Sequence, residues 1–227
     1  MIPPDGRLPP DLVVFDVDGT LHDTFRWWGP VLREGLIEFG ARLGFEPVLP
    51  DDEEAASVVG LRDEGVWAPF LPPEHRHRWR EFRKVVVPLE LAIVRGGRDF
   101  LFPGVRDLLR RLRELGVKVA LASNCRSAYM GAMMDGQGLA DLSDWQFCLD
   151  SPGVENKTDM LRQARARACA ARPVMVGDRE ADRDPARILG WPFVWRRNAR
   201  CAIRDAEIVW DGSAEELLGK LGVSGIS

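Results

Sequence analysis

Short runs of apolar residues recur along this chain, separated by stretches in which apolar and polar residues follow a helical repeat. Such runs, bounded by polar or turn-forming residues, are typical of strands buried on both faces of a sheet and are too short for buried helices. We predict six strands, at Leu12–Val17, Val117–Ala122, Trp145–Leu149, Pro173–Val176, Phe193–Trp195 and Ile208–Trp210.

Helical patterns lie between the later strands. Four apolar residues between Val105 and Leu112 follow the i, i+3, i+4, i+7 spacing, and Gly116 ends this pattern just before the second predicted strand. Ser213 and Glu216 have the spacing of a capping box for the last helix. The alternation of strands and helices predicts an α/β fold with a doubly wound parallel sheet.

One interval, residues 23–95, has helical spacing and no convincing strand. A first amphipathic helix covers Trp28 to Leu43, a second begins at Asp52, and a third begins at Glu74 after two prolines. We therefore predict an α/β core of residues 1–22 and 96–227 and an inserted all-helical cap of residues 23–95.

Composition and charge narrow the function classes. The 227 residues carry a formal net charge of −4, which gives no general electrostatic attraction to nucleic acid or to an anionic membrane. No apolar stretch has the length of a membrane span, and the first residues lack the features of a secretory signal. The cysteines are widely spaced, without a CxxC pair, which favours reduced thiols and a cytoplasmic location. They are Cys125, Cys148, Cys169 and Cys201.

Polar residues gather where the predicted strands end. In a doubly wound sheet, ligands bind beyond the carboxyl ends of the strands, so residues from several loops are expected to meet there. The first, second and fourth strands all end in such residues, and a lysine begins the helix before the fourth strand. The candidate site residues are Asp16, Asp18, Ser123, Asn124, Lys157, Asp178 and Asp182.

These residue types are suited to phosphoryl transfer. Several carboxylates in one dry site repel one another, and Mg²⁺ relieves this repulsion while sharing phosphate oxygens. Lys157 and the Ser123 hydroxyl supply a positive charge and a donor for phosphoryl oxygens. An ionised aspartate such as Asp16 can attack phosphorus to form an aspartyl phosphate, and a second, such as Asp18, can transfer protons.

Four segments occur in a fixed order along the chain: Asp16-Val-Asp18-Gly-Thr-Leu, Ser123, Lys157 and a Gly-Asp-x-x-x-Asp segment that starts at Gly177. This pattern resembles the haloacid dehalogenase superfamily, and it is most similar to the phosphoglycolate phosphatase and β-phosphoglucomutase branch. The resemblance covers almost the whole chain and implies a helical cap. It implies Asp16 as nucleophile, Asp18 as general acid and base, and Ser123, Asn124 and Lys157 at the phosphoryl group. It also implies a Mg²⁺ site formed by Asp16, the Asp18 carbonyl and Asp178, with Asp182 as a direct or indirect ligand.

We therefore expect a magnesium-dependent phosphatase that acts on a small phosphorylated metabolite, with phosphoglycolate as the first substrate to test. The partner is a small molecule, not a nucleic acid or a membrane, and the chain is a monomer or a homodimer. Two alternatives stay open. One is a β-phosphoglucomutase-like mutase that returns the phosphoryl group to a sugar, and the other is a non-catalytic binding protein with the same fold.

Several further residues carry weaker signals. Asp184 before Pro185 has the pattern of a helix N-cap. Arg62 in the cap either faces solvent or binds a distal anion of the substrate, and Cys125 is expected to be buried and inert. The tryptophans of the cap are expected to pack its core, with one or two at the mouth of the site: Trp27, Trp28, Trp67 and Trp79.

Overall fold

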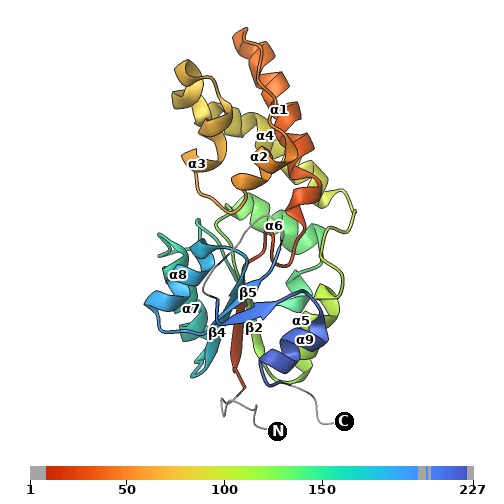
Figure 1. The fold of residues 1–227 in the computed structure, drawn as a ribbon, viewed down its shortest axis with the longest axis vertical. Helices are drawn as coiled ribbons and strands as arrows, with labels where there is room; N and C mark the ends of the chain where they lie inside the picture. Colours follow the sequence, from red (N-terminus) through yellow and green to blue (C-terminus); the bar gives the residue numbers. More distant parts are fainter. Residues whose placement is uncertain (1–8, 199–202, 204–205, 224–227) are drawn as a thin grey trace.

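A six-stranded sheet, with all its paired strands parallel, forms the centre of the described structure (Figure 1). The computed structural model describes residues 9–198, 203 and 206–223. The strand order is β3-β2-β1-β4-β5-β6, so the chain winds outward in one direction from β1 and then in the other from β4. The α/β doubly wound prediction is confirmed. The strands are β1 Leu12–Phe15, β2 Lys118–Ala122, β3 Trp145–Phe147, β4 Pro173–Gly177, β5 Phe193–Arg196 and β6 Ile208–Trp210.

Two strands end earlier than the apolar pattern predicted. β1 stops at Phe15 because the carbonyl of Val17 accepts hydrogen bonds from the amides of Leu21 and His22, which turns the chain out of the sheet. β3 stops at Phe147, and the amide of Leu149 donates to the carbonyl of Cys125 in the loop after β2. Both apolar runs continue into the loops that surround the site.

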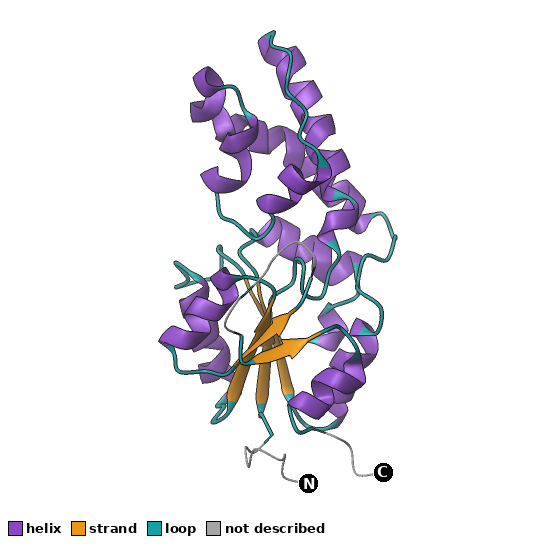
Figure 2. Ribbon diagram, viewed as in Figure 1, coloured by secondary structure: helices purple, strands orange, loops and turns teal. Residues whose placement is uncertain are grey.

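Helices cover both faces of the sheet (Figure 2). Alternate residues of β1 belong to different hydrophobic clusters: Val13 and Phe15 pack on one face, Leu12 and Val14 on the other. The first face is covered by α5 Val105–Glu114, α6 Ser127–Gly136 and α9 Ala214–Lys220, and the second by α7 Lys157–Ala168 and α8 Glu180–Ile188.

The predicted N-cap at Asp184 is wrong. α8 already begins at Glu180, and Asp184 and Pro185 lie inside it. The helix starts earlier because the Asp182 carboxylate accepts a hydrogen bond from the amide of Arg179 at 3.1 Å. The predicted cap at Ser213 is present, since its hydroxyl accepts from the amide of Glu216.

A helical region lies between β1 and β2 in the chain and above the carboxyl edge of the sheet (Figure 1). The third predicted helix of this region starts later than expected, at Trp79, because residues Pro73–Arg78 form a 3₁₀ turn. The elements of this region are η1 Thr24–Arg26, α1 Trp28–Leu43, α2 Asp52–Ser57, α3 Glu64–Trp67, η2 Ala68–Phe70, η3 Pro73–Arg78 and α4 Trp79–Arg95. A further 3₁₀ turn, η4 Ala140–Leu142, follows α6.

Hydrogen bonds and an ion pair connect the helical region to the two ends of α6. Buried Gln137 at the end of α6 donates to the carbonyls of Val94 and Arg98 and accepts from the amide of Phe100. Asp63 forms an ion pair with Arg126 at 2.5 Å. No helix among the described residues is long and apolar enough to cross a membrane. The boundaries of the core and cap stay a prediction.

Candidate active site

Asp16 is the first residue beyond β1, at the point where the strand order reverses. Its amide donates to the carbonyl of Val176 in β4, so the backbone of the neighbouring strand fixes its position. The side chain is buried, and its Oδ1 accepts a hydrogen bond from Lys157 Nζ at 2.7 Å. Ligands of doubly wound sheets bind at this switch point.

Lys157 is held in place by the start of α7. Asn156 caps this helix and forms a reciprocal capping box with Asp159, which makes Lys157 the first helical residue. Its ammonium pairs with both Asp16 and Asp182 inside the protein. Although burial acts against the charged form, these two carboxylates raise the pKa of Lys157 above its ordinary value, so the lysine stays charged.

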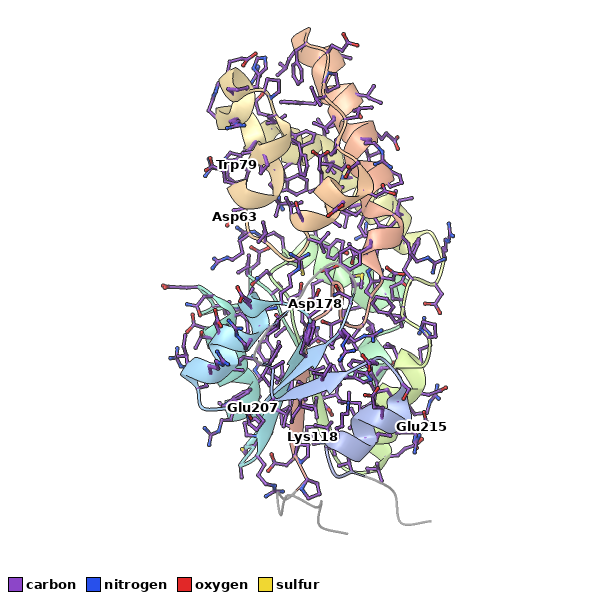
Figure 3. The ribbon with its side chains drawn as sticks, viewed as in Figure 1. Asp63, Trp79, Lys118, Asp178, Glu207 and Glu215 are labelled. Carbon is purple, nitrogen blue, oxygen red and sulfur yellow. The ribbon has the colours of Figure 1, made fainter. Side chains whose placement is uncertain are left out.

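Three buried aspartates lie together at this edge of the sheet. Each of Asp16, Asp178 and Asp182 has an oxygen within 4.8 Å of the others. Asn198 donates to Asp178 Oδ2 at 2.9 Å, whereas Asp178 Oδ1 is buried and has no hydrogen-bond partner among the described residues. Figure 3 shows Asp178 between the sheet and the helical region.

The electrostatics of this cluster favour a bound cation. Burial, followed by the charge of Asp182, raises the pKa of Asp178 to about 7. The same two causes raise the pKa of Asp16 well above its ordinary value, and Lys157 opposes them only in part. The backbone also approaches this cluster closely, because a Cβ at Gly19 would lie 2.6 Å from Asp178 Oδ2. A divalent cation with oxygen ligands would balance this charge.

Asp18 belongs to a second hydrogen-bond network, formed with Thr24, Tyr129 and Ser123. Its Oδ1 accepts from Thr24 Oγ1 at 2.5 Å and from Tyr129 Oη at 2.8 Å, and its Oδ2 accepts from Ser123 Oγ at 3.4 Å. His22 Nδ1 lies 2.9 Å from Thr24 Oγ1. Burial lowers the pKa of His22 to about 4, so the imidazole is neutral and its Nδ1–H donates to the threonine that donates to Asp18.

The loop after β2 completes the polar side of the site. Ser123 is buried, and its hydroxyl oxygen accepts from the amide of Cys125 at 3.2 Å. Asn124 Nδ2 donates to the carbonyl of Gly60 in the helical region at 3.0 Å. Burial raises the pKa of the Cys125 thiol well above its ordinary value, which agrees with an inert cysteine.

A pocket of about 120 Å³ opens beside Asp16 and Asp18, between the ends of the strands and the helical region. Trp27, Trp28 and Trp67 line it, whereas Trp79 is not among its lining residues. Arg62 does not line it either; this exposed side chain donates to the carbonyl of Glu155.

The family comparison agrees with this geometry. A model of the haloacid dehalogenase-like hydrolases matches residues 10–190. The chain belongs to this hydrolase family. The match spans the first aspartate motif, the helical region and the loops that follow β2, β3 and β4.

Relatives of this hydrolase include proteins with different names. "Tyrosine-protein kinase PtkA" of Mycobacterium tuberculosis is 30% identical over 203 residues, covering 81% of this chain and 63% of that protein. The chain therefore spans less than two thirds of that relative. "Phosphoglycolate phosphatase" of Pseudomonas savastanoi is 27% identical over 192 residues, covering 82% and 68%.

Solved structures share the fold. A haloacid dehalogenase-like hydrolase from Streptococcus pneumoniae superposes with a TM-score of 0.75 at 18% identity, covering 92% of this chain and 97% of that one. CbbY from Rhodobacter sphaeroides in complex with phosphate gives 0.69 at 21% identity, covering 92% and 96%.

The structure adds site residues that sequence patterns did not indicate. Thr24 and Tyr129 contact Asp18 directly, and Arg83 and Glu90 on α4 line the pocket. Burial, followed by the charge of Asp18, raises the pKa of Glu90 to about 8. The helical pattern of α4 carried a partial signal, since residues 83, 87 and 90 repeat on one helix face.

Proposed function

We propose that this hydrolase removes the phosphoryl group from a small phosphate monoester through an aspartyl phosphate on Asp16. One observation carries the proposal: buried Asp16 lies at the end of the pocket, paired to a buried lysine and beside two further aspartates. A carboxylate in this position can attack phosphorus, and Lys157 can pair with the phosphoryl oxygens.

Mg²⁺ is the metal we propose for this site. The donor set consists of carboxylate oxygens alone, without histidine or cysteine, which suits a hard cation. Asp16 and the partnerless Asp178 Oδ1 would hold it. Asp182 already accepts from Lys157 and from the amide of Arg179, so we propose that it acts by holding Lys157. When bound, the ion would neutralise charge on the carboxylates and the phosphoryl group.

The remaining steps use Asp18. As Asp16 attacks phosphorus, the bond from phosphorus to the leaving oxygen breaks, and Asp18, which is protonated for this step, gives its proton to that oxygen to form the alcohol. Asp18 then accepts a proton from the water that hydrolyses the aspartyl phosphate, which restores both residues. The hydrogen bonds from Thr24 and Tyr129 hold the Asp18 carboxylate in one orientation.

The names of the relatives provide only a first candidate for the substrate. Phosphoglycolate is in the name of the Pseudomonas relative and is the first ester to test. A phosphosugar mutase would use the same aspartyl phosphate, so product analysis with a phosphorylated hexose separates the two. Because the mycobacterial relative is named a tyrosine-protein kinase, a third assay tests transfer of a phosphoryl group from ATP to a tyrosine peptide.

The test compares wild type with Asp16→Asn in a phosphate-release assay with p-nitrophenyl phosphate and Mg²⁺. We expect the variant to lose about 10⁴-fold or more in kcat. Exposed Asp141, changed to Asn in the same way, is the matched control and should keep full activity. Retained turnover in Asp16→Asn overturns the covalent mechanism. Isomerisation of the hexose phosphate, or transfer to the peptide without phosphate release, overturns the phosphatase.

A further inference from the structure

A line of aromatic rings runs from Asp18 into the helical region. It begins at Tyr129, whose hydroxyl contacts Asp18, and continues through Trp27 at a ring-centroid distance of 6.3 Å. Trp28 follows at 6.2 Å and Trp67 at 5.7 Å, both in edge-to-face arrangements. All four rings border the pocket, so the space beside the reacting atoms has an aromatic wall.

Aliphatic side chains also line the pocket. Val59 and Val66 from the helical region and Val87 from α4 line it. At about 120 Å³ the pocket is close to the size of an apolar cavity of roughly 150 Å³ that holds one benzene molecule. The aromatic and aliphatic part of its lining therefore suits a single apolar ring, beside a polar end formed by Asp16, Asp18 and Ser123.

One polar atom in this wall lacks a partner. Trp27 is 4% exposed, and its Nε1–H has no hydrogen-bond acceptor among the described residues. Trp28, by contrast, donates to the carbonyl of Ala55 at 2.9 Å. A buried N–H without an acceptor costs free energy, and a ligand oxygen in the pocket would remove that cost.

We infer that the ester cleaved at Asp16 carries a flat apolar body of about one ring next to its phosphate, as in an aryl or arylalkyl phosphate. This inference rests on the proposed function and narrows its substrate class. Arg83 and Glu90 line the same pocket from one face of α4, so its lining also includes two charged groups. Phosphoglycolate has no apolar body, so it would leave the aromatic wall unused.

The experiment compares benzyl phosphate with ethyl phosphate, two esters whose alcohols have similar acidity. With the full chain and Mg²⁺, we expect kcat/KM for the benzyl ester to exceed that for the ethyl ester by roughly 10- to 100-fold, the effect of burying one ring. Equal values, or a preference for the ethyl ester, overturn the inference and leave the phosphatase intact. If neither ester nor p-nitrophenyl phosphate releases phosphate, the proposed function fails and the inference fails with it.

Filling the pocket provides a second test. Val87→Phe places a ring where the substrate ring would lie, and the benzyl-to-ethyl ratio should fall about tenfold. Val66→Phe makes the same change from α3, which keeps the test available should one variant fold poorly. The matched control is Val48→Phe, because Val48 is 87% exposed and outside the pocket, and it should leave the ratio unchanged. An unchanged ratio in folded Val87→Phe and Val66→Phe overturns the inference.

Discussion

The sheet and the helical region contribute unlike walls to one pocket. On the sheet side, the site consists of charged groups at the ends of parallel strands, held by backbone hydrogen bonds and by buried ion pairs such as Lys157 with Asp16. On the helical side, it consists of aromatic and aliphatic side chains together with the charged Arg83 and Glu90 of α4. Under the proposed function, the sheet side would perform the phosphoryl transfer and the helical side would select the ester.

Among the changes that test the different roles of the two sides, Lys157→Met should have the largest effect on kcat. It removes the only cation that contacts both Asp16 and Asp182 among the described residues, and we expect kcat to fall by roughly 10²- to 10³-fold. Because the change lies on the sheet side, benzyl and ethyl phosphate should lose activity equally. Exposed Lys84→Met is the control. A loss confined to one ester contradicts these different roles.

The effect of pH on the metal-free protein is next in size. Burial raises the pKa of Asp178 to about 7 in the folded state, so this group favours folding in acid and opposes it as pH rises from about 4 to about 7. The free energy of unfolding of wild type relative to Asp178→Asn should fall on the order of 3 kcal/mol over this range in a chelator. Urea unfolding at several pH values measures this difference.

Adding Mg²⁺ should reverse that loss. At pH 8 we expect the ion to raise the Tm of wild type and to leave that of Asp178→Asn nearly unchanged, because binding to the folded state stabilises it. An equal rise in both proteins would mean that the ion binds elsewhere.

The two walls also differ in how far the sequence predicts them. Asp16, Lys157 and Asp178 follow or precede buried strands, and the geometry of parallel strands brings such positions together whatever the loops between them contain. Tyr129 has no local signal, since its contact with Asp18 spans 111 residues and depends on how α6 packs against α4. α3 has only four residues, too few for a helical repeat to appear.

The wrong prediction of an N-cap at Asp184 also results from a contact between segments that are distant in the sequence. An aspartate before a proline is a good local N-cap pattern, but the side chain of Asp182 accepts from the amide of Arg179, and this residue caps α8 five positions earlier. Asp182 is held there by the buried Lys157. A contact between distant segments thus outweighed a local preference.

Gly35→Ala tests the packing of the helical wall alone. A Cβ at this position in α1 would lie 2.5 Å from Val86 Cγ2 in α4, so the two helices must move apart. We expect a loss of about 1–3 kcal/mol in the free energy of unfolding, measured in urea. Gly131→Ala in α6 is the control, because nothing lies within 4 Å of its Cβ and it should be neutral or slightly stabilising. Equal effects of both changes contradict close packing of α1 on α4.

Tyr129→Phe has the smallest expected effect on kcat. It tests a residue that contacts both Asp18 and the aromatic rings of the pocket. Tyr129 donates to Asp18 through its hydroxyl and continues the aromatic line through its ring, and the substitution removes only the first contact. The loss of one hydrogen bond to a carboxylate should lower kcat about tenfold for both esters with little change in KM or Tm. Thr24→Val removes another donor to Asp18 and should act in the same direction. If Tyr129→Phe instead raises KM for benzyl phosphate and leaves kcat intact, the hydroxyl contributes to binding of the ester. Tyr129 would then act only with the aromatic residues that line the pocket.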